Sequence, residues 1–204
     1  MSQHLTDWSN NLYPSLVDNI SIILENIPHN GILFDIGANT GVITDYVTKS
    51  KPDVKAWLFE PVEEYSDYCK DKFSNDPNIH VENIALSDVN GWCKVNKDGS
   101  NLGFNQIEPV EHSDIITQTL STYCWNHRIR YIDFIKIDVE GHECQVLRGM
   151  LRFLDGNDRR PMILCEIGWY PESESEMFDL LVREYGYEMT RLDKDVLLKQ
   201  KVCK

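Results

Sequence analysis

Apolar residues in this chain occur with two spacings, one typical of helices and one typical of buried strands. Residues 12–27 place apolar side chains three or four positions apart, which predicts a helix, and the Pro-His-Asn-Gly sequence after it predicts its end. Short segments rich in apolar residues predict strands. These segments lie at 32–34, 54–59, 79–85, 133–139 and 162–167. Helical spacing returns between them, from 42 onward and at 62–73, 120–127 and 146–154.

The C-terminal part continues this alternation and then changes. Ser173 and Glu176 form a capping-box pair that predicts a helix start, and Gly186 suits the position after the helix end at Tyr185. Two extended runs, 187–192 and 196–202, predict a hairpin. Strands alternating with helices predict an α/β fold, a mostly parallel sheet with helices on both faces. The hairpin adds antiparallel strands at its end.

One region departs from the alternation. Between 88 and 114 glycines punctuate the chain, with a short strand predicted at 92–95 and an extended segment at 115–119. We interpret 88–130 as an insertion over the end of the sheet. The whole chain, 1–204, is otherwise predicted to be a single domain, with an N-terminal helix within 1–28.

Composition narrows the classes of function. The chain has 42% hydrophobic and 26% charged residues, as in soluble globular proteins, and no apolar run reaches membrane-spanning length. The N-terminus has no signal-peptide pattern, so we expect a cytoplasmic protein. A net charge of −13 argues against binding long nucleic acids. The pairs Arg128/Arg130 and Arg159/Arg160, the candidates for a basic patch, are interpreted as solvated loop charges. Six cysteines without a C-x-x-C pair predict reduced thiols and no zinc site.

The most informative local feature is the sequence GILFDIGANTGVITDYV at 31–47. A strand, a glycine loop and a helix in this order predict a ligand site, with loop amides and the helix N-terminus facing the ligand. A dinucleotide fingerprint requires glycine at the first, third and sixth positions, which are Gly37, Asn39 and Val42 here. The pattern G-x-N-x-G after Asp35 resembles instead the nucleoside-binding loop of S-adenosylmethionine (SAM) methyltransferases. The loop residues Gly37, Ala38, Asn39 and Gly41 are thus candidate cofactor contacts.

Two acids accompany this loop. Asp35 either accepts amides of its own loop or has a functional role, in which it orders that loop or takes up the positive end of the ligand. Glu60 lies 25 residues further on, at the predicted end of the next strand, where an acid suits ribose hydroxyls. Its structural alternative is to cap the helix for which Pro61 would be the first residue. In the segment NIALSD at 83–88, Ala85 and Leu86 could contact adenine, with Ser87 or Asp88 near its amino group.

The second strong feature is FIKIDVEGHECQVLRG at 134–149. Strand alternation places Lys136, Asp138 and Glu140 on one face. A lysine inside a parallel strand is unusual, because both faces of such a strand are covered, and it requires a carboxylate partner. Asp138 and Glu166 are the candidates, either as part of a functional site or as a structural ion pair. The strands carrying Asp35 and Asp138 are expected to be neighbours where the strand order reverses, which is where ligands bind.

The segments FDIGANTG, LFEPVEE, NIALSD and FIKIDVEGHECQVLRG, at this spacing, resemble the FkbM family of SAM-dependent methyltransferases over about residues 30–170. The resemblance implies the Rossmann-like, seven-stranded class I methyltransferase fold and O-methylation of sugars, lipids or natural products. By resemblance, the SAM contacts are Asp35, Gly37, Asn39, Gly41, Glu60 and Asp138. Residues 88–130 match poorly, and we expect them to shape the acceptor site.

Methyl transfer to a hydroxyl needs alignment and a proton acceptor. His142 is the natural candidate base by its intrinsic pKa, although the family commonly has a small residue there and a solvent-facing role is an alternative. Asp138, Glu140 and Lys136 are other candidates. Asp138, Glu140 and Glu166 could also bind Mg²⁺.

Two rival classes stay open. One is an NAD-dependent oxidoreductase, which the residues at positions 39 and 42 disfavour. The other is a non-catalytic SAM-binding module acting in a complex. The acceptor is expected to be a sugar, a lipid or another small molecule, and a second copy of the chain or a partner protein could complete its pocket.

Overall fold

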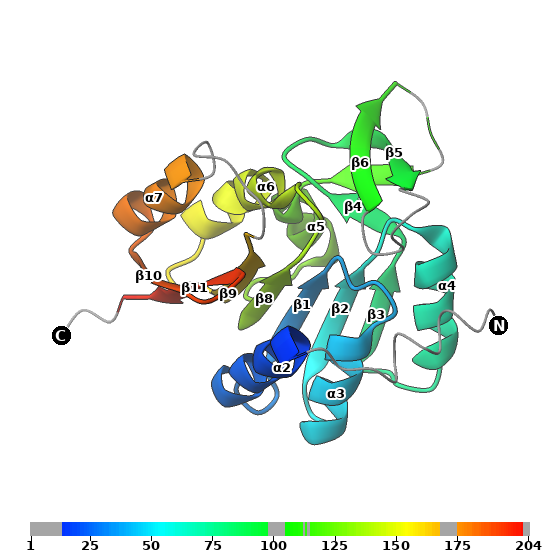
Figure 1. Cartoon of the computed structure of the whole chain (residues 1–204), viewed down its shortest axis with the longest axis horizontal. Coiled ribbons are helices and arrows are strands. Elements are labelled where there is room, and N and C mark those ends of the chain that lie inside the picture. The colour runs from blue at the N-terminus through cyan, green and yellow to red at the C-terminus, as the bar shows by residue number, and fades with distance from the viewer. Residues whose placement is uncertain (1–13, 98–104, 112, 114, 168–174, 202–204) are drawn as a thin grey trace.

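The main sheet of the molecule has seven strands in the order β10-β11-β9-β8-β1-β2-β3 (Figure 1). The structure is a computed structural model that describes residues 14–97, 105–111, 113, 115–167 and 175–201. The strands are β1 (Ile32–Ile36), β2 (Lys55–Phe59), β3 (Ile79–Glu82), β8 (Phe134–Ile137), β9 (Met162–Glu166), β10 (Tyr187–Arg191) and β11 (Asp195–Gln200). Strands β3, β2, β1, β8 and β9 run parallel, whereas β11 is antiparallel to both β9 and β10. This confirms the predicted mostly parallel sheet with a C-terminal hairpin.

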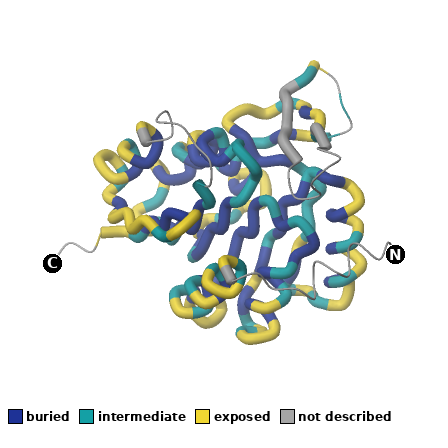
Figure 2. Tube along the Cα trace, viewed as in Figure 1, coloured by how far each residue is buried: buried dark blue, intermediate teal, exposed yellow. Residues whose placement is uncertain are grey.

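Helices cover both faces of this sheet, as predicted (Figure 1). On one face lie α2 (Pro14–Asn26), α3 (Val42–Ser50) and α4 (Glu63–Lys72). On the other lie α5 (Leu120–His127), α6 (Glu143–Asp155) and α7 (Ser175–Glu184). Strand side chains point alternately to the two faces of a sheet. In β1, Leu33 therefore packs in the apolar cluster beneath α2, α3 and α4, and Phe34 packs in the one beneath α5, α6 and α7. Both side chains are fully buried. Figure 2 shows the central strands buried and the outer helix surfaces exposed.

A second, four-stranded sheet in the order β4-β7-β5-β6 follows β3 directly. Its strands are β4 (Ile84–Leu86), β5 (Gly91–Lys97), β6 (Asn105–Val110) and β7 (Ile115–Gln118). The prediction of one strand over 79–85 is therefore wrong. Asn83 ends β3 because its side-chain amide donates to the carbonyl oxygens of Glu60 (2.9 Å) and Pro61 (3.1 Å), which turns the chain away from the main sheet. The short strand predicted at 92–95 is part of the longer β5.

Several local predictions can be compared with the structure. Pro61 is not the first residue of a helix, because Val62 is the N-cap of α4 and Pro61 precedes it. Gly186 has φ +68° just after α7, as its predicted position requires. Ser173 lies outside the described residues. Five cysteines are described, and none of these forms a disulfide. Among the described helices, none is long and apolar enough to cross a membrane.

Candidate functional site

Lys136 is the centre of a buried charge cluster at the carboxyl edge of the main sheet. In the register of β1 and β8 it lies beside Asp35, and its side chain is only 4% exposed. Its ammonium group donates to the carbonyl oxygen of Gly37 at 2.9 Å and lies 3.5 Å from Asp35 Oδ1 and 3.4 Å from Asp138 Oδ2. Burial favours the neutral amine, but the charges of Asp138 and Asp35 outweigh burial and raise the pKa of Lys136 above its usual range.

Of these three contacts of Lys136, the one with Asp138 was predicted, and those with Asp35 and Gly37 were missed. The neighbouring positions of β1 and β8 and the Lys136–Asp138 pair agree with the sequence analysis. Asp35 was not recognised as the second partner of Lys136, although both residues were already placed on adjacent strands. Nor does Asp35 accept amides of its own loop in the described structure. Its other oxygen accepts the Thr44 hydroxyl at 2.7 Å, so this carboxylate ties α3 to β8.

The glycine loop between β1 and α3 folds back onto β2. The amides of Gly37 and Ala38 both donate to the carbonyl oxygen of Phe59, and the amide of Gly41 donates to that of Ala38. The amide of Asn39 donates to Glu60 Oε2 at 2.8 Å. The expectation that these amides face a ligand is therefore wrong: they hold the shape of the loop.

That shape requires glycine at two positions. A Cβ atom on Gly37, whose φ is +73°, would lie 1.9 Å from the carbonyl oxygen of Asp138. Gly41 has φ +66°, and a Cβ there would lie 2.7 Å from the ring of Phe73. The loop and the turn after β8 are consequently in direct backbone contact, which leaves no room for a side chain between them.

Glu60 stands between the loop and the start of α4. It is 5% exposed, and its carboxylate accepts the amides of Asn39 (2.8 Å) and Val62 (2.9 Å). Burial raises the pKa of Glu60 to about 7, against the lowering effect of these two amides. The capping alternative is wrong, because Val62 is the N-cap of α4 and no side-chain hydrogen bond caps this helix. Each oxygen retains a second lone pair, so the ribose contact stays a prediction.

The turn after β8 is held in an unusual backbone conformation. Glu140 has φ +54°, which is rare for a residue with a side chain, and Gly141 has φ +101°. The buried carboxylate of Glu143 accepts the amides of Val139 (3.0 Å) and Gly141 (3.1 Å) and so fixes the turn. Sequence analysis missed this role of Glu143, because an acid in the first turn of a helix ordinarily faces solvent. Burial, with the charges of Asp138 and Glu143, raises the pKa of Glu140 to about 7.

Three carboxylates meet at this turn, as the sequence suggested for Asp138, Glu140 and Glu166. Their nearest oxygens lie within 4.8 Å of one another. Burial and the charge of Asp138 raise the pKa of Glu166 well above its usual range, and its side chain hydrogen-bonds to Asp138. Burial would raise the pKa of Asp138, but Lys136 and this bond lower it below its usual range. Asp138 is thus an anion, and its side chain is 39% exposed.

His142 is the N-cap of α6 and is partly buried. Its Nε2 lies 2.9 Å from Ser87 Oγ, which in turn lies 3.2 Å from Asp88 Oδ1. Burial lowers the pKa of His142, and Asp88 partly opposes this. Close approach of α6 to Ser87 depends on Gly149, where a Cβ would lie 2.0 Å from the Ser87 carbonyl oxygen. The sequence offered no signal for this contact.

The remaining predicted cofactor contacts are less distinctive. Ala85 and Leu86 are both buried, and Leu86 belongs to the apolar cluster under α5 and α6. Their contact with an adenine ring stays a prediction.

A seven-stranded sheet in this order, with a glycine loop after β1 and acids at the ends of β1 and β2, defines the Rossmann-like class I methyltransferase fold. Residues 35–189 match the model of the methyltransferase FkbM domain. The chain therefore belongs to the FkbM methyltransferase family.

Individual relatives are distant. The hexuronic acid methyltransferase AglP of Haloferax volcanii is 25% identical over 195 residues, covering 87% of this chain and 73% of the relative. The methyltransferase sdnD of Sordaria araneosa is 22% identical over 211 residues, covering 82% and 78%. Among solved structures, an O-methyltransferase from Bacillus cereus in complex with SAH has a TM-score of 0.57 at 12% identity, covering 96% of this chain and 88% of that one. This last similarity concerns the fold alone.

Proposed function

We propose that this chain transfers the methyl group of SAM to a hydroxyl group of a small acceptor, with a sugar as the favoured class. The observation that carries the proposal is the contact between the glycine loop and the turn after β8, which Lys136 secures through Gly37. A relative that is a hexuronic acid methyltransferase supports a sugar acceptor. Lipids and other small molecules with a hydroxyl group are the alternatives.

The residues around the loop fit SAM. Gly37 and Gly41 keep side chains away from the loop backbone, and the free lone pairs of Glu60 suit two ribose hydroxyls. The anionic, partly exposed Asp138 suits the positive end of the cofactor. Bound SAM supplies a methyl group on a sulfonium centre, which makes its carbon electrophilic. The chain then has to align the acceptor and remove its proton.

We infer that His142 takes the acceptor proton. When Ser87 donates its single hydroxyl hydrogen to Asp88, its oxygen accepts a hydrogen bond from Nε2–H of His142. The imidazole is then held in the tautomer whose Nδ1 carries a free lone pair. A lowered pKa keeps His142 neutral at pH 7, as a base requires. Ser87 and Asp88 act in this scheme as positioning residues.

Glu140 is the second candidate base. Its pKa near 7 is suited to proton transfer at neutral pH, and its positive φ is the kind of backbone strain found at functional sites. Lys136 is unsuited, since its raised pKa keeps it charged, and we assign it to holding the loop. We derive no step through Mg²⁺, because Asp138 and Glu166 share a proton and Asp138 already pairs with Lys136.

Calorimetry with SAM and with NAD tests the cofactor. We expect SAM to bind and NAD not to bind, and the reverse would favour the oxidoreductase. Incubation with radiolabelled SAM and separate pools of uronic acid sugars, neutral sugars and lipids then tests transfer. Binding of SAM without label in any pool would favour a non-catalytic module.

The pH dependence of kcat/KM separates the two bases. If His142 is the base, the acidic limb lies below pH 6.5 and disappears in His142→Ala, whereas Glu140→Gln retains it. Ser87→Ala should shift the pH of this acidic limb, because the His142 ring is then no longer held in one tautomer. The KM for SAM should stay largely unchanged. An acidic limb near pH 7 that is lost in Glu140→Gln would assign the role to Glu140 instead.

A further inference from the structure

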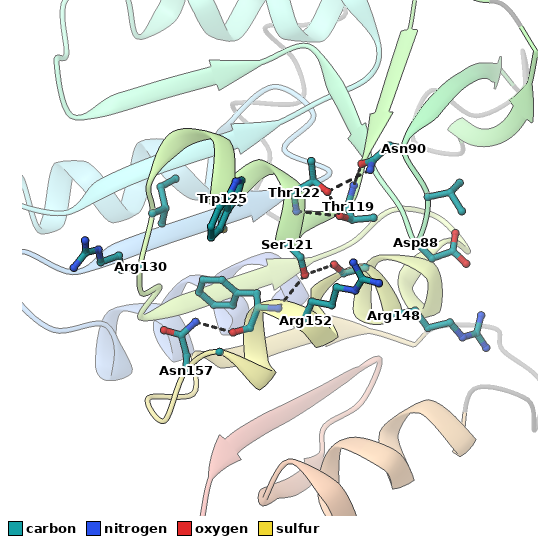
Figure 3. A pocket seen from close by; sticks show the side chains of 16 residues that line it. Asp88, Asn90, Thr119, Ser121, Thr122, Trp125, Arg130, Arg148, Arg152 and Asn157 are labelled. Carbon is teal, nitrogen blue, oxygen red and sulfur yellow. Dashed lines mark hydrogen bonds between the residues drawn. The ribbon is translucent and has the colours of Figure 1, made fainter.

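A groove of about 930 Å³ lies on the outer surface between α5 and α6, apart from the glycine loop (Figure 3). One end is formed by Asp88 and Arg148, and the other by Arg130 and Asn157. Trp125 of α5 stands between these ends (Figure 3), and Phe153 of α6 also lines the groove. A volume of this size is in the usual range for ligand sites.

The floor of the groove is fixed by a hydrogen bond between the two helices. Ser121 Oγ donates to the carbonyl oxygen of Gly149 at 2.7 Å and accepts the amide of Phe153 at 3.0 Å. These two groups are hydrogen-bond partners in a regular helix, and the hydroxyl of α5 contacts both of them (Figure 3). A floor built in this way is preformed and need not be ordered when a ligand binds.

The charge of the groove is opposite to that of the chain. Three arginines, Arg130, Arg148 and Arg152, line it with one acid, Asp88, in a protein of net charge −13. Within the described residues, none of the three guanidinium groups has an ion pair or a hydrogen bond. Asp155, three residues beyond Arg152, instead accepts the Tyr185 hydroxyl at 3.0 Å.

The arginines of α6 lower the stability of their own helix. Arg148 and Arg152 lie one helical turn apart on α6, and like charges at that spacing destabilise a helix by about 0.2–0.5 kcal/mol. Both side chains are exposed, and the fold itself gains no contact from their charge. An anionic ligand would supply the missing partner, and a guanidinium group matches a carboxylate with two parallel hydrogen bonds.

The aromatic wall indicates the rest of the ligand. Trp125 is 84% exposed, which is unusual for the largest apolar side chain, and it lines the groove together with the buried Phe153. A flat aromatic face beside hydrogen-bonding groups suits a sugar ring, which has an apolar face and polar edges. The groove also reaches Asp88, which contacts Ser87 and through it His142, so its end adjoins the proposed base.

We propose that the groove between α5 and α6 binds a short acidic oligosaccharide, whose carboxylates pair with Arg148 and Arg152 and one of whose rings stacks on Trp125. The ligand is the acceptor of the proposed reaction, extended beyond the sugar that is methylated, so this inference rests on the proposed function. It adds a subsite that selects acceptors by their charge.

The test is calorimetric titration of the full chain with a galacturonic acid hexamer, which carries a carboxylate on every ring, and with neutral maltohexaose. We expect the acidic hexamer to bind at least about tenfold more tightly and to weaken as salt is raised. The double variant Arg148→Gln/Arg152→Gln should weaken its binding by about tenfold, and Trp125→Ala by about fivefold. Arg191→Gln, which removes an exposed arginine on β10, is the matched control and should bind as the wild type does.

Each outcome is decisive. Equal binding of the two hexamers, or equal binding by the wild type and both groove variants, would overturn the proposal. A parallel series titrates a hexaglutamate peptide and a thymidine hexanucleotide. If either of these binds and the acidic hexamer does not, the proposal is overturned as well. Titration of the wild type with SAM tests the proposed function separately. If SAM binds but the groove does not distinguish the two hexamers, the subsite alone is rejected. If the groove selects the acidic hexamer but SAM does not bind, the methyl transfer alone is rejected.

Discussion

Replacing Lys136 by methionine tests the charge cluster most directly. The substitution retains an unbranched chain of similar length but removes the charge that lies 3.5 Å from Asp35 and 3.4 Å from Asp138. Asp35 is fully buried, so its carboxylate would be left without a counter-charge in a site that excludes water. Breaking a buried ion pair from one side costs about 3–5 kcal/mol, a large fraction of the total stability of a typical domain.

The origin of this loss can be isolated with a double-mutant cycle. Asp35→Asn retains an oxygen for the Thr44 hydroxyl and leaves Lys136 paired with Asp138, so it should cost only about 1–2 kcal/mol. In the double variant the fully buried carboxylate of Asp35 is gone, and the charge left beside position 136 is that of the partly exposed Asp138. We therefore expect the double variant to be more stable than the sum of the single losses implies, by about 1–3 kcal/mol.

Urea unfolding followed by tryptophan fluorescence and by circular dichroism measures these differences, provided that the two transitions coincide. SAM affinity should fall in Lys136→Met as well, because the bond that holds Gly37 is lost. A loss below about 1 kcal/mol in Lys136→Met, or single losses that add within about 0.5 kcal/mol, would refute the reasoning, since neither is compatible with a buried, coupled pair.

Three other predictions concern close contacts and pH. Gly37→Ala should lower SAM affinity by about tenfold or more and destabilise the fold, whereas Gly91→Ala, where a Cβ would have its nearest neighbour at 3.7 Å, should be tolerated in both assays. Gly149→Ala should reduce kcat more than SAM affinity, because a Cβ there pushes on the backbone of Ser87; an equal loss of both would contradict a role at the acceptor side. The folded-state pKa of Glu60, about 7, lies above its ordinary value of 4.5, so the stability it contributes is present below pH 4.5 and is lost by pH 7. That loss amounts to about 3 kcal/mol. In urea unfolding, the decrease in the free energy of unfolding between pH 4.5 and pH 7 should therefore be smaller by this amount in Glu60→Gln than in the wild type.

Much of the main sheet could be predicted because its strands are buried on both faces. Segments such as Ile32–Ile36, which is apolar except for Asp35, leave few other interpretations, and the helices between them carry regular apolar spacing. The break at Asn83 could not be predicted. Its side chain bonds to carbonyl groups more than twenty residues earlier in the chain, and no local pattern encodes such a contact.

The site was predictable in its residue types and less so in its contacts. The glycine loop, Glu60 and the Lys136–Asp138 segment follow from sequence pattern and family resemblance. The direction of the loop amides could not be predicted, because it depends on the carbonyl group at the end of β2. The roles of Glu143 and Gly149 depend on burial and on the approach of α6, which only the assembled fold determines.

The second sheet has a consequence for how specificity can diverge in this family. The chain enters it one residue after β3 and leaves it one residue before α5, and between these points β5 pairs with both β6 and β7. Both ends of this layer therefore lie next to elements that pack on the main sheet, and we expect the residues between them to be replaceable while the strands beneath keep their register. Chimaeras joined at Asn83 and Thr119 would show how much of acceptor choice lies in this layer and how much in α5 and α6.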